Sequence, residues 1–337
     1  MKKNRALFVT PCYYTGTSFE RIYNSIHQII KQRNLPIDVY IDKIYPNTLK
    51  PGELDDVRYE KSQAETIKYL LSKKCSKYNK ILFIDFFNPG VELVRYMSDH
   101  ANNEIKIAAL LHGGTFIQGD LYSDKWVSCA EKTWAEIYDR IYVPSQYAQS
   151  QIPSDIASKA VVKPWGMDNI NQSNYAKPYE NRTIDVVFPH RLNTDKGIDD
   201  FIKISHMMPK TNFVITTPTE INNTTTNNLA SQKNITFITC KDTDDLYKIL
   251  GSSKIVLSCA KQELFGYSIA EACRLGCVPI LPSSQVYKEL YDKNSLYEDL
   301  PQCIAMITDV LSKNLSINFN NDLKTSFEPL LSDFLQF

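Results

Sequence analysis

Two glutamates separated by seven residues, Glu263 and Glu271, stand in the segment Lys261–Gly276, KQELFGYSIAEACRLG. Glu263 falls in the loop after an apolar run, and Gly266 precedes a helical pattern that carries Glu271. The N-terminus of that helix offers backbone N–H groups and a partial positive charge, which suit a diphosphate. Glu271 can then accept hydrogen bonds from a ribose, and Glu263 can reach a sugar hydroxyl. The segment therefore indicates a nucleotide-sugar site, with two ordinary surface charges as the alternative.

A basic pair lies upstream in FPHRLNTDKG, residues 188–197, between another apolar run and another helical pattern. Arg191 can make a forked contact with phosphate oxygens, and Lys196 adds a point charge. Both would stabilise negative charge that builds on a departing diphosphate. The alternative is a basic pair at an exposed turn, but the nearby glutamates favour the phosphate site.

These side chains need a scaffold, and the first half of the chain alternates between apolar runs and helical patterns. The runs predict strands at 6–10 (ended by Pro11), 37–41, 80–87, 105–111 and 140–143. Helical spacing predicts helices at 18–33, 63–71 and 91–97. Continuous apolar strands that alternate with helices are typical of a parallel sheet covered on both faces.

The second half repeats this alternation after a polar stretch, 169–182, which we interpret as an interdomain linker. Strands are predicted at 184–188, 212–216, 234–238, 254–257 and 278–281, and helices at 197–207, 242–250 and 267–275. We expect two doubly wound, Rossmann-like α/β domains that face a central cleft, at residues 1–168 and 183–315. Ligands bind such sheets at the carboxyl ends of their strands. A final helix, within 316–337, is expected to pack back on the first domain.

Composition limits the function classes. The chain has 337 residues and equal numbers of basic and acidic residues, 38 each, so it lacks the strong positive balance of many nucleic-acid-binding proteins. The apolar run after the basic N-terminus is too short for a secretory signal, and no stretch is long enough to span a membrane. The eight cysteines show no metal-ligand spacing, which favours reduced thiols in a cytoplasmic protein.

The segment 261–282 resembles the E-x7-E motif of GT4-type retaining glycosyltransferases, written E-x-F-G-x-x-x-x-E-A-x-A-x-G with a proline after it. Glu263, Phe265, Gly266, Glu271 and Gly276 stand in register, whereas Arg274 departs from the usual small residue. The segment 188–197 resembles the G-R-L-x-x-x-K-G pattern of the same family. His190 departs there, because it stands where the family usually has glycine. The resemblance implies the GT-B fold.

The first half resembles the family more loosely. His112 follows a predicted strand and precedes Gly113-Gly114, where the family has a histidine near the reacting carbon of the sugar. The loop 11–18, PCYYTGTS, takes the place of a glycine-rich loop that touches phosphate and acceptor. Only Gly16 remains of those glycines, so acceptor contact is the more natural role of this loop.

The resemblance implies a retaining hexosyltransferase that needs no cofactor and no essential metal, with a nucleoside-diphosphate sugar, UDP-linked in most relatives, as substrate. The implied catalytic residues are Glu263, His112, Lys196 and Arg191. The residues implied to bind the sugar nucleotide are Arg191, Lys196, Phe265, Gly266, Tyr267, Ser268, Glu271 and Gly16.

The acceptor stays open among glycan, lipid, protein and modified nucleic acid, and nucleic acid is expected only as an acceptor. Peripheral membrane contact also stays open, as does a role for the basic residues from Lys68 to Lys80. A dehydrogenase is disfavoured because G-x-G-x-x-G does not follow the first strand. A sugar-nucleotide epimerase of the GT-B fold and a non-catalytic nucleotide-sugar-binding scaffold are the remaining alternatives.

Overall fold

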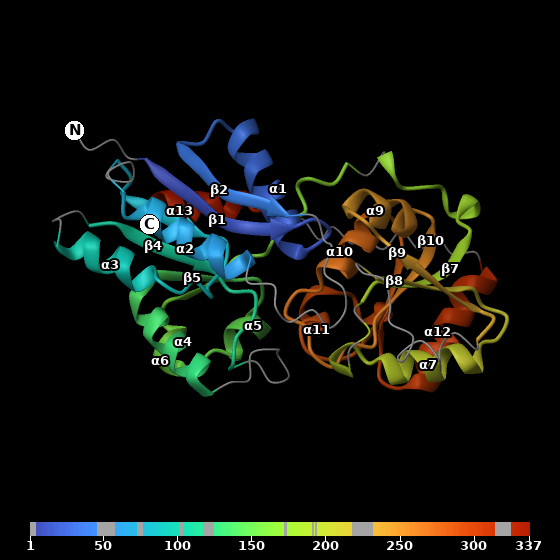
Figure 1. Ribbon diagram of the computed structural model, residues 1–337. Coiled ribbons are helices and arrows are strands. Elements are labelled where there is room, and N and C mark those ends of the chain that lie inside the picture. The colour runs from blue at the N-terminus through green and yellow to red at the C-terminus, as the bar shows by residue number, and fades with distance from the viewer. Residues whose placement is uncertain are drawn as a thin grey trace. The chain divides into compact units, whose positions relative to one another are not determined.

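The computed structural model describes residues 5–45, 58–72, 77–100, 104–116, 125–171, 174–190, 192, 194–217, 232–313 and 325–337. They form two compact units (Figure 1). The first unit contains the described residues up to Asn169 together with Thr325–Phe337, and the second contains those from Ile170 to Lys313. Arg191 and the polar loop 222–228 lie outside the described residues, as do Lys73 and Lys74 of the basic cluster.

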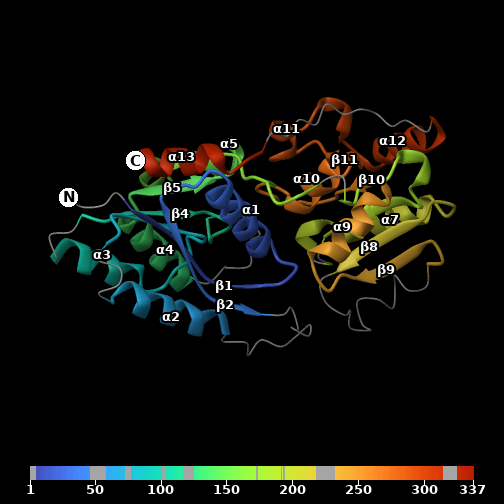
Figure 2. The ribbon, with the colours of Figure 1, turned by 90° about the horizontal axis from the view of Figure 1, so that it is seen from above.

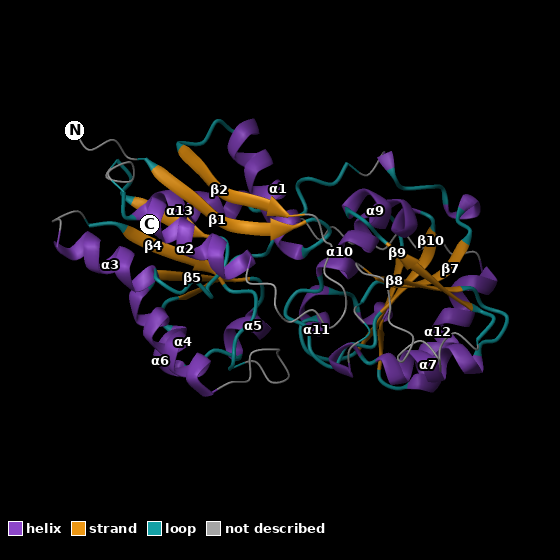
Figure 3. Ribbon diagram, viewed as in Figure 1, coloured by secondary structure: helices purple, strands orange, loops and turns teal. Residues whose placement is uncertain are grey.

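The first unit is built on a parallel sheet with the strand order β2-β1-β3-β4-β5-β6. Its strands are β1 (Ala6–Tyr14), β2 (Ile37–Tyr45), β3 (Lys80–Phe83), β4 (Lys106–Leu110), β5 (Arg140–Val143) and β6 (Ala160–Val162). Its helices are α1 (Ser18–Gln32), α2 (Arg58–Leu70), α3 (Val91–His100), α4 (Lys125–Ile137), α5 (Gln146–Ser150), α6 (Ser154–Ala157) and α13 (Glu328–Gln336). Helices cover both faces of this sheet (Figure 3).

Strand β1 continues through Pro11, where the sequence predicts its end. The strand pairs with β3 only as far as Val9, but its pairing with β2 continues to Tyr14. Beyond Val9 the strand therefore has one neighbour, and a proline without an N–H group is tolerated on such an edge. The extension carries the chain directly to the loop that contains Gly16.

Helix α13 belongs to the first unit and lies beside β5 (Figure 2). Its inward face buries Leu330, Leu331 and Phe334 completely. On the same helix Asp333 accepts a hydrogen bond from Tyr142 of β5 (2.8 Å) and forms an ion pair with Arg140. The helix is therefore fixed to the sheet by both apolar contacts and charge.

The second unit also has a parallel sheet, in the order β12-β11-β10-β7-β8-β9. Its strands are β7 (Ile184–Phe188), β8 (Phe213–Thr217), β9 (Ile235–Thr239), β10 (Ser253–Leu257), β11 (Val278–Pro282) and β12 (Leu296–Tyr297). Its helices are α7 (Ile198–Met207), α9 (Thr243–Gly251), α10 (Tyr267–Arg274), α11 (Tyr287–Leu290) and α12 (Leu300–Lys313), with 3₁₀ turns η3 (Tyr179–Asn181), η4 (Thr194–Lys196) and η5 (Lys293–Ser295). Helices α7 and α12 share one buried apolar cluster with the sheet, and α9 and α10 pack on β7, β10 and β11.

The described part of the stretch 169–182 is packed against the second unit. The guanidinium of Arg182 is buried and donates hydrogen bonds to the carbonyl oxygens of Ser253 (2.6 Å), Leu275 (2.8 Å) and Lys177 (3.0 Å). Gly251 lies against the same stretch, since a Cβ there would be 2.1 Å from the carbonyl oxygen of Tyr175. Residues 174–182 are therefore part of this unit.

The two doubly wound α/β domains predicted from the sequence are confirmed: each unit has six parallel strands and covering helices. Within the described residues, no helix combines the length and apolar character required to cross a lipid bilayer.

Candidate functional site

Two loops meet at the carboxyl edge of the second sheet, one after β7 and one after β10. The strands β7 and β10 are hydrogen-bonded neighbours, so their loops emerge side by side. The amide of Lys261 in the second loop donates a 2.7 Å hydrogen bond to the carbonyl oxygen of Asp195 in the first. This backbone bond joins the basic segment to the segment that carries Glu263.

The junction places Lys196 against Glu263. The Lys196 Nζ atom lies 3.1 Å from Glu263 Oε2 and donates a 2.9 Å hydrogen bond to the carbonyl oxygen of Gln262. Only 13% of the Lys196 side chain and 18% of the Glu263 side chain are exposed, which reduces screening of the pair by solvent. Two residues that are 67 positions apart therefore form one charged centre.

Glu263 is also held through its backbone, because its amide donates a 2.9 Å hydrogen bond to Gln285 Oε1 from the loop after β11. Burial acts to raise the pKa of the Glu263 carboxyl, but the electrostatic effects of Lys196 and His190 and the hydrogen bonds from Lys196 and Leu264 outweigh it. The pKa is therefore lower than usual, and Glu263 is ionised at neutral pH.

The loop leads into α10 through Gly266, whose φ of +78° is in the left-handed region that favours glycine. Phe265 and Tyr267 are buried with their rings 5.1 Å apart in a T-shaped contact, and Ser268 is partly exposed. The first intrahelical N–H bonds come from Ile269 and the residue after it, both to the Gly266 carbonyl oxygen. The amides before them are those that a helix N-terminus offers to an anion.

Glu271 is buried, with 1% of its surface exposed. Its Oε1 accepts a 2.8 Å hydrogen bond from the hydroxyl of Tyr247 on α9. The carboxylate thus links α9 to α10, and an exchange of this bond or a small shift of the side chain would be needed for contact with a ribose.

His112 belongs to the first unit, directly after β4. Its Nε2 atom donates a 2.7 Å hydrogen bond to the carbonyl oxygen of Ile84, and the centre of its ring is 4.5 Å from that of Phe19 and 4.7 Å from that of Trp165. Burial lowers the pKa of His112 more than the bond to Ile84 raises it, and the result is about 4. The imidazole is therefore neutral at pH 7, with Nδ1 as a hydrogen-bond acceptor.

Gly16 also belongs to the first unit, in a left-handed conformation with φ +79°. Its N–H group donates a 2.7 Å hydrogen bond to Glu20 Oε2 on α1. The amide N–H group that a glycine-rich loop would offer to a phosphate is thus hydrogen-bonded to the carboxylate of Glu20. This geometry suits acceptor contact better than phosphate binding.

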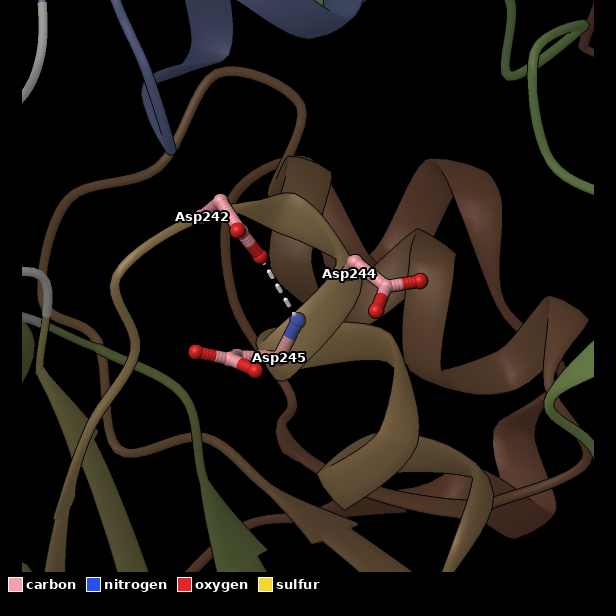
Figure 4. A group of neighbouring side chains, drawn as sticks. All are labelled: Asp242, Asp244 and Asp245. Atoms are coloured by element: carbon pink, nitrogen blue, oxygen red, sulfur yellow. Dashed lines mark hydrogen bonds between the residues drawn. The ribbon is translucent and has the colours of Figure 1, made fainter.

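Within the described residues, one group of three or more Asp, Glu, His or Cys side chains is close enough together to bind a metal ion (Figure 4). It consists of Asp242, Asp244 and Asp245 at the start of α9. Asp242 caps the helix by accepting a 2.9 Å hydrogen bond from the amide of Asp245, and Asp244 is paired with Lys248. The carboxylate of Asp245 accepts a 3.3 Å hydrogen bond from the amide of Lys241. Capping, a surface ion pair and this backbone bond account for the three carboxylates.

Three polar residues around Glu263 were not predicted from the sequence: Ser258, Gln285 and Tyr287. Ser258 follows β10 directly, and its position at a strand end was a usable signal. Gln285 and Tyr287 lie in the loop after β11 and the short helix α11, where neither spacing nor composition marks them.

Comparison with known proteins finds a family match and a curated relative. The model of the family "Glycosyl transferases group 1" matches residues 172–297, which include both loops. The tRNA-queuosine alpha-mannosyltransferase of Drosophila melanogaster is 43% identical over 54 residues, and this match covers 16% of the chain and 14% of that protein.

Solved structures extend the similarity to nearly the full chain. Sucrose-phosphate synthase from Thermosynechococcus elongatus has a TM-score of 0.72 at 12% identity and covers 99% of this chain and 98% of its own. Anabaena HepE, solved with UDP-glucose, has a TM-score of 0.64 at 12% identity and covers 98% of each chain. UDP-GlcNAc 2-epimerase from Neisseria meningitidis has a TM-score of 0.59 at 14% identity and covers 99% of this chain and 100% of its own. The fold is thus that of GT-B proteins, and the family match over the second unit supports a glycosyltransferase.

Proposed function

We propose that this protein is a retaining glycosyltransferase that moves a sugar from a nucleoside-diphosphate sugar, with UDP favoured, to an acceptor hydroxyl and needs no metal. The largely buried Lys196–Glu263 pair at the carboxyl edge of the second sheet is the observation that carries this proposal. The proposal assigns phosphate binding to the cation of this pair and sugar binding to its carboxylate, and both residues lie on loops that the family model includes.

In this reaction Lys196 binds the diphosphate and exchanges part of its contact with Glu263 for phosphate oxygens. Arg191, which lies outside the described residues, has the same role by its place in the motif. The acceptor oxygen bonds to the anomeric carbon on the face from which the phosphate oxygen departs. The acceptor proton passes to that phosphate oxygen, so the products are the glycoside and the free nucleoside diphosphate. Lys196 stabilises the charge that develops on the leaving group.

Glu263 positions the sugar and stabilises the positive charge that develops near its anomeric carbon. The depressed pKa of Glu263 keeps this carboxylate charged at neutral pH, as that role requires. His112 is neutral and acts as a hydrogen-bonding group toward the sugar rather than as a cation. Tyr267 and Ser268 contribute amides at the start of α10, and Glu271 binds the ribose after it releases Tyr247.

The acceptor is proposed to bind the first unit. The sequence match to a tRNA-queuosine alpha-mannosyltransferase makes queuosine-containing tRNA one candidate acceptor and mannose one candidate sugar. Glycans, lipids and proteins remain in the acceptor panel, since the match covers a small part of both chains.

The experiment is a panel of UDP-, GDP- and ADP-sugars tested with the purified protein in excess EDTA. Thermal shift reports binding, and nucleoside-diphosphate release reports slow hydrolysis of the sugar donor. Binding and hydrolysis of one sugar donor in EDTA support the proposal. Absence of both for every sugar nucleotide, with and without Mg²⁺, overturns it. Binding without turnover for any acceptor class indicates a scaffold.

Stereochemistry and reaction type need a second readout on the active sugar donor. Proton NMR of the released sugar, recorded before mutarotation, should show the anomeric configuration of the donor. The opposite anomer contradicts retention. An epimerase would convert the sugar nucleotide to its epimer, and this product is distinguished in the same spectra.

A further inference from the structure

Three side chains form a hydrogen-bonded chain at the carboxyl edge of the second sheet. His190 Nε2 lies 2.9 Å from Ser258 Oγ, which lies 2.9 Å from the hydroxyl oxygen of Tyr287. Ser258 and Tyr287 are fully buried and His190 is 6% exposed. We refer to His190, Ser258 and Tyr287 as the relay.

The sheet order explains why these residues meet. β10 lies between β7 and β11, and His190, Ser258 and Tyr287 follow β7, β10 and β11 respectively. All three strands are parallel, so their carboxyl ends lie at one edge. The relay therefore runs across the edge from which both loops of the candidate site emerge.

The hydrogens of the relay are coupled. Ser258 Oγ also accepts a 3.2 Å hydrogen bond from the amide of Ala260, which leaves it one lone pair and one proton. Either Tyr287 donates to Ser258 and Ser258 donates to His190, or His190 donates to Ser258 and Ser258 donates to Tyr287. In the second arrangement the Tyr287 hydroxyl accepts from Ser258, so its own proton is available for a hydrogen bond outside the relay.

Tyr287, at the far end of the relay, and Glu263 both lie against Gly266. A Cβ on Gly266 would be 3.4 Å from Glu263 Cγ, 3.4 Å from Tyr287 Cε1 and 3.6 Å from the Tyr287 hydroxyl oxygen, so Gly266 is a thin spacer between them. After burial, Glu263 is the charged group that acts most strongly to raise the pKa of Tyr287, and His190 acts to lower the pKa of Glu263. Both ends of the relay are thus close enough to affect the carboxylate.

We propose that His190, acting through Ser258, holds the Tyr287 phenol beside Glu263 and thereby positions that carboxylate for the sugar of the bound sugar nucleotide. His190, Ser258 and Tyr287 are positioning residues, since the carboxylate of Glu263 makes the contact with substrate. This inference rests on the proposed function. It assigns a role to the histidine that departs from the glycine of the family pattern.

The test compares Tyr287→Phe, His190→Phe and His190→Gln with the wild type, using the sugar donor that the panel identifies. Glutamine preserves a hydrogen-bonding nitrogen near the position of Nε2, whereas phenylalanine does not. We expect Tyr287→Phe and His190→Phe to lower kcat for hydrolysis of the sugar donor about tenfold, because a small misplacement of a catalytic group is costly. KM and the Kd for the free nucleoside diphosphate should stay within about threefold. His190→Gln should recover most of the lost kcat.

Tyr297→Phe is the matched control, because the Tyr297 hydroxyl is also buried and donates a 2.9 Å hydrogen bond to the carbonyl oxygen of Ser258. It removes a buried hydroxyl beside Ser258 but leaves the relay intact, so kcat should be unchanged. Equal kcat for Tyr287→Phe and Tyr297→Phe overturns the proposal, as does equal kcat for His190→Phe and His190→Gln. A wild type that neither binds nor turns over a sugar nucleotide overturns the proposed function itself, which is a different result.

Discussion

The α-carbon of Gly197 lies against the carbonyl group of Cys259, at a distance that only glycine permits. A Cβ on Gly197 would be 2.0 Å from that carbonyl oxygen, and the residue has a φ of +70°. The contact presses the loop after β7 onto the loop after β10, beside the bond between Lys261 and Asp195. The spacing between Lys196 and Glu263 depends on this close approach.

Gly197→Ala should therefore destabilise the second unit strongly. The left-handed conformation costs about 1–2 kcal/mol for alanine, and displacement of backbone should bring the total to about 3 kcal/mol or more. Urea unfolding of the variant measures this loss. Gly266→Ala is the matched control, since it has a similar φ but its Cβ would be no closer than 3.4 Å to any neighbour. It should lose only the conformational part, and equal losses for the two variants would refute the packing explanation.

Replacement of Glu263 by glutamine should separate chemistry from phosphate binding. The variant keeps the size of the side chain but removes the negative charge beside the sugar, so kcat should fall by about two orders of magnitude or more. Because Lys196 remains, the Kd for the free nucleoside diphosphate should change by less than about fivefold. Initial rates and isothermal titration calorimetry measure the two quantities.

Replacement of Lys196 by methionine should give the complementary result. Loss of the phosphate contact should weaken binding of the nucleoside diphosphate by about tenfold or more, since a charged hydrogen bond contributes about 1.5–3 kcal/mol. The pKa of the Glu263 carboxyl should rise, because its nearest cation is gone. Lys203→Met is the control: Lys203 forms an exposed pair with Asp200 in the same unit, and its loss should affect neither binding nor rate. Wild-type affinity in the Lys196 variant would remove Lys196 from the site.

The neutral state of His112 predicts a pH dependence of stability. Its folded pKa of about 4 is below the unfolded value of about 6.5, so the unfolded chain binds more protons between these pH values. Stability from this group is complete above about pH 6.5 and is lost as pH falls toward 4, by about 2–3 kcal/mol. His112→Gln should reduce the slope of unfolding free energy against pH in this window. NMR titration of the ring should show no protonation above pH 5, and a transition near 6.5 would contradict the structure.

The lowered pKa of Asp333 predicts a second loss of stability at acid pH, in the first unit. Burial acts to raise the pKa of its carboxyl, but hydrogen bonds from Tyr142 and Arg140 and the charges of Arg140 and Lys163 lower it below the usual value. The stabilisation is present above the unfolded pKa of about 3.9 and is lost as pH falls through the folded pKa. Asp333→Asn should lower the free energy of unfolding at pH 7 by about 2 kcal/mol. It should also make this free energy less dependent on pH in the acid range. Asp309→Asn, which removes an exposed pair with Lys313, should do neither.

The sequence predicts the strands of both sheets well where an apolar run ends at a turn, and β5 and β7 have the predicted bounds. Helix α12 is absent from the predicted elements although Cys303, Ile307 and Val310 give a helical apolar stripe, so this signal was available. Helix α4 is harder to predict, because its buried face includes Glu131, whose carboxylate accepts hydrogen bonds from Thr115. A buried charge satisfied by a distant residue breaks the apolar pattern.

The residues of the candidate site also differ in whether a local sequence pattern marks them. Lys196 and Glu263 are visible in the sequence because each belongs to a spaced motif. The hydrogen bond from Glu263 to Gln285 and the bonds of the relay are not visible in the sequence. They depend on the sheet order that places β10 between β7 and β11. Short-range patterns do not encode strand order, so neighbours contributed by three separate loops appear only in three dimensions.

The bond network around Asp168 bears on the order in which the units mature during synthesis. Asp168 accepts hydrogen bonds from the hydroxyl of Ser326 (2.7 Å) and the amide of Phe327 (3.1 Å), and all three residues belong to the first unit. The second unit lies between them in the sequence, so the ribosome finishes it first. The first unit therefore cannot complete its fold, and β5 lacks its contacts with α13, until residues 325–337 have left the ribosome. A nascent chain whose residues have left the ribosome only as far as position 324 would carry a complete second unit and an unfinished first one.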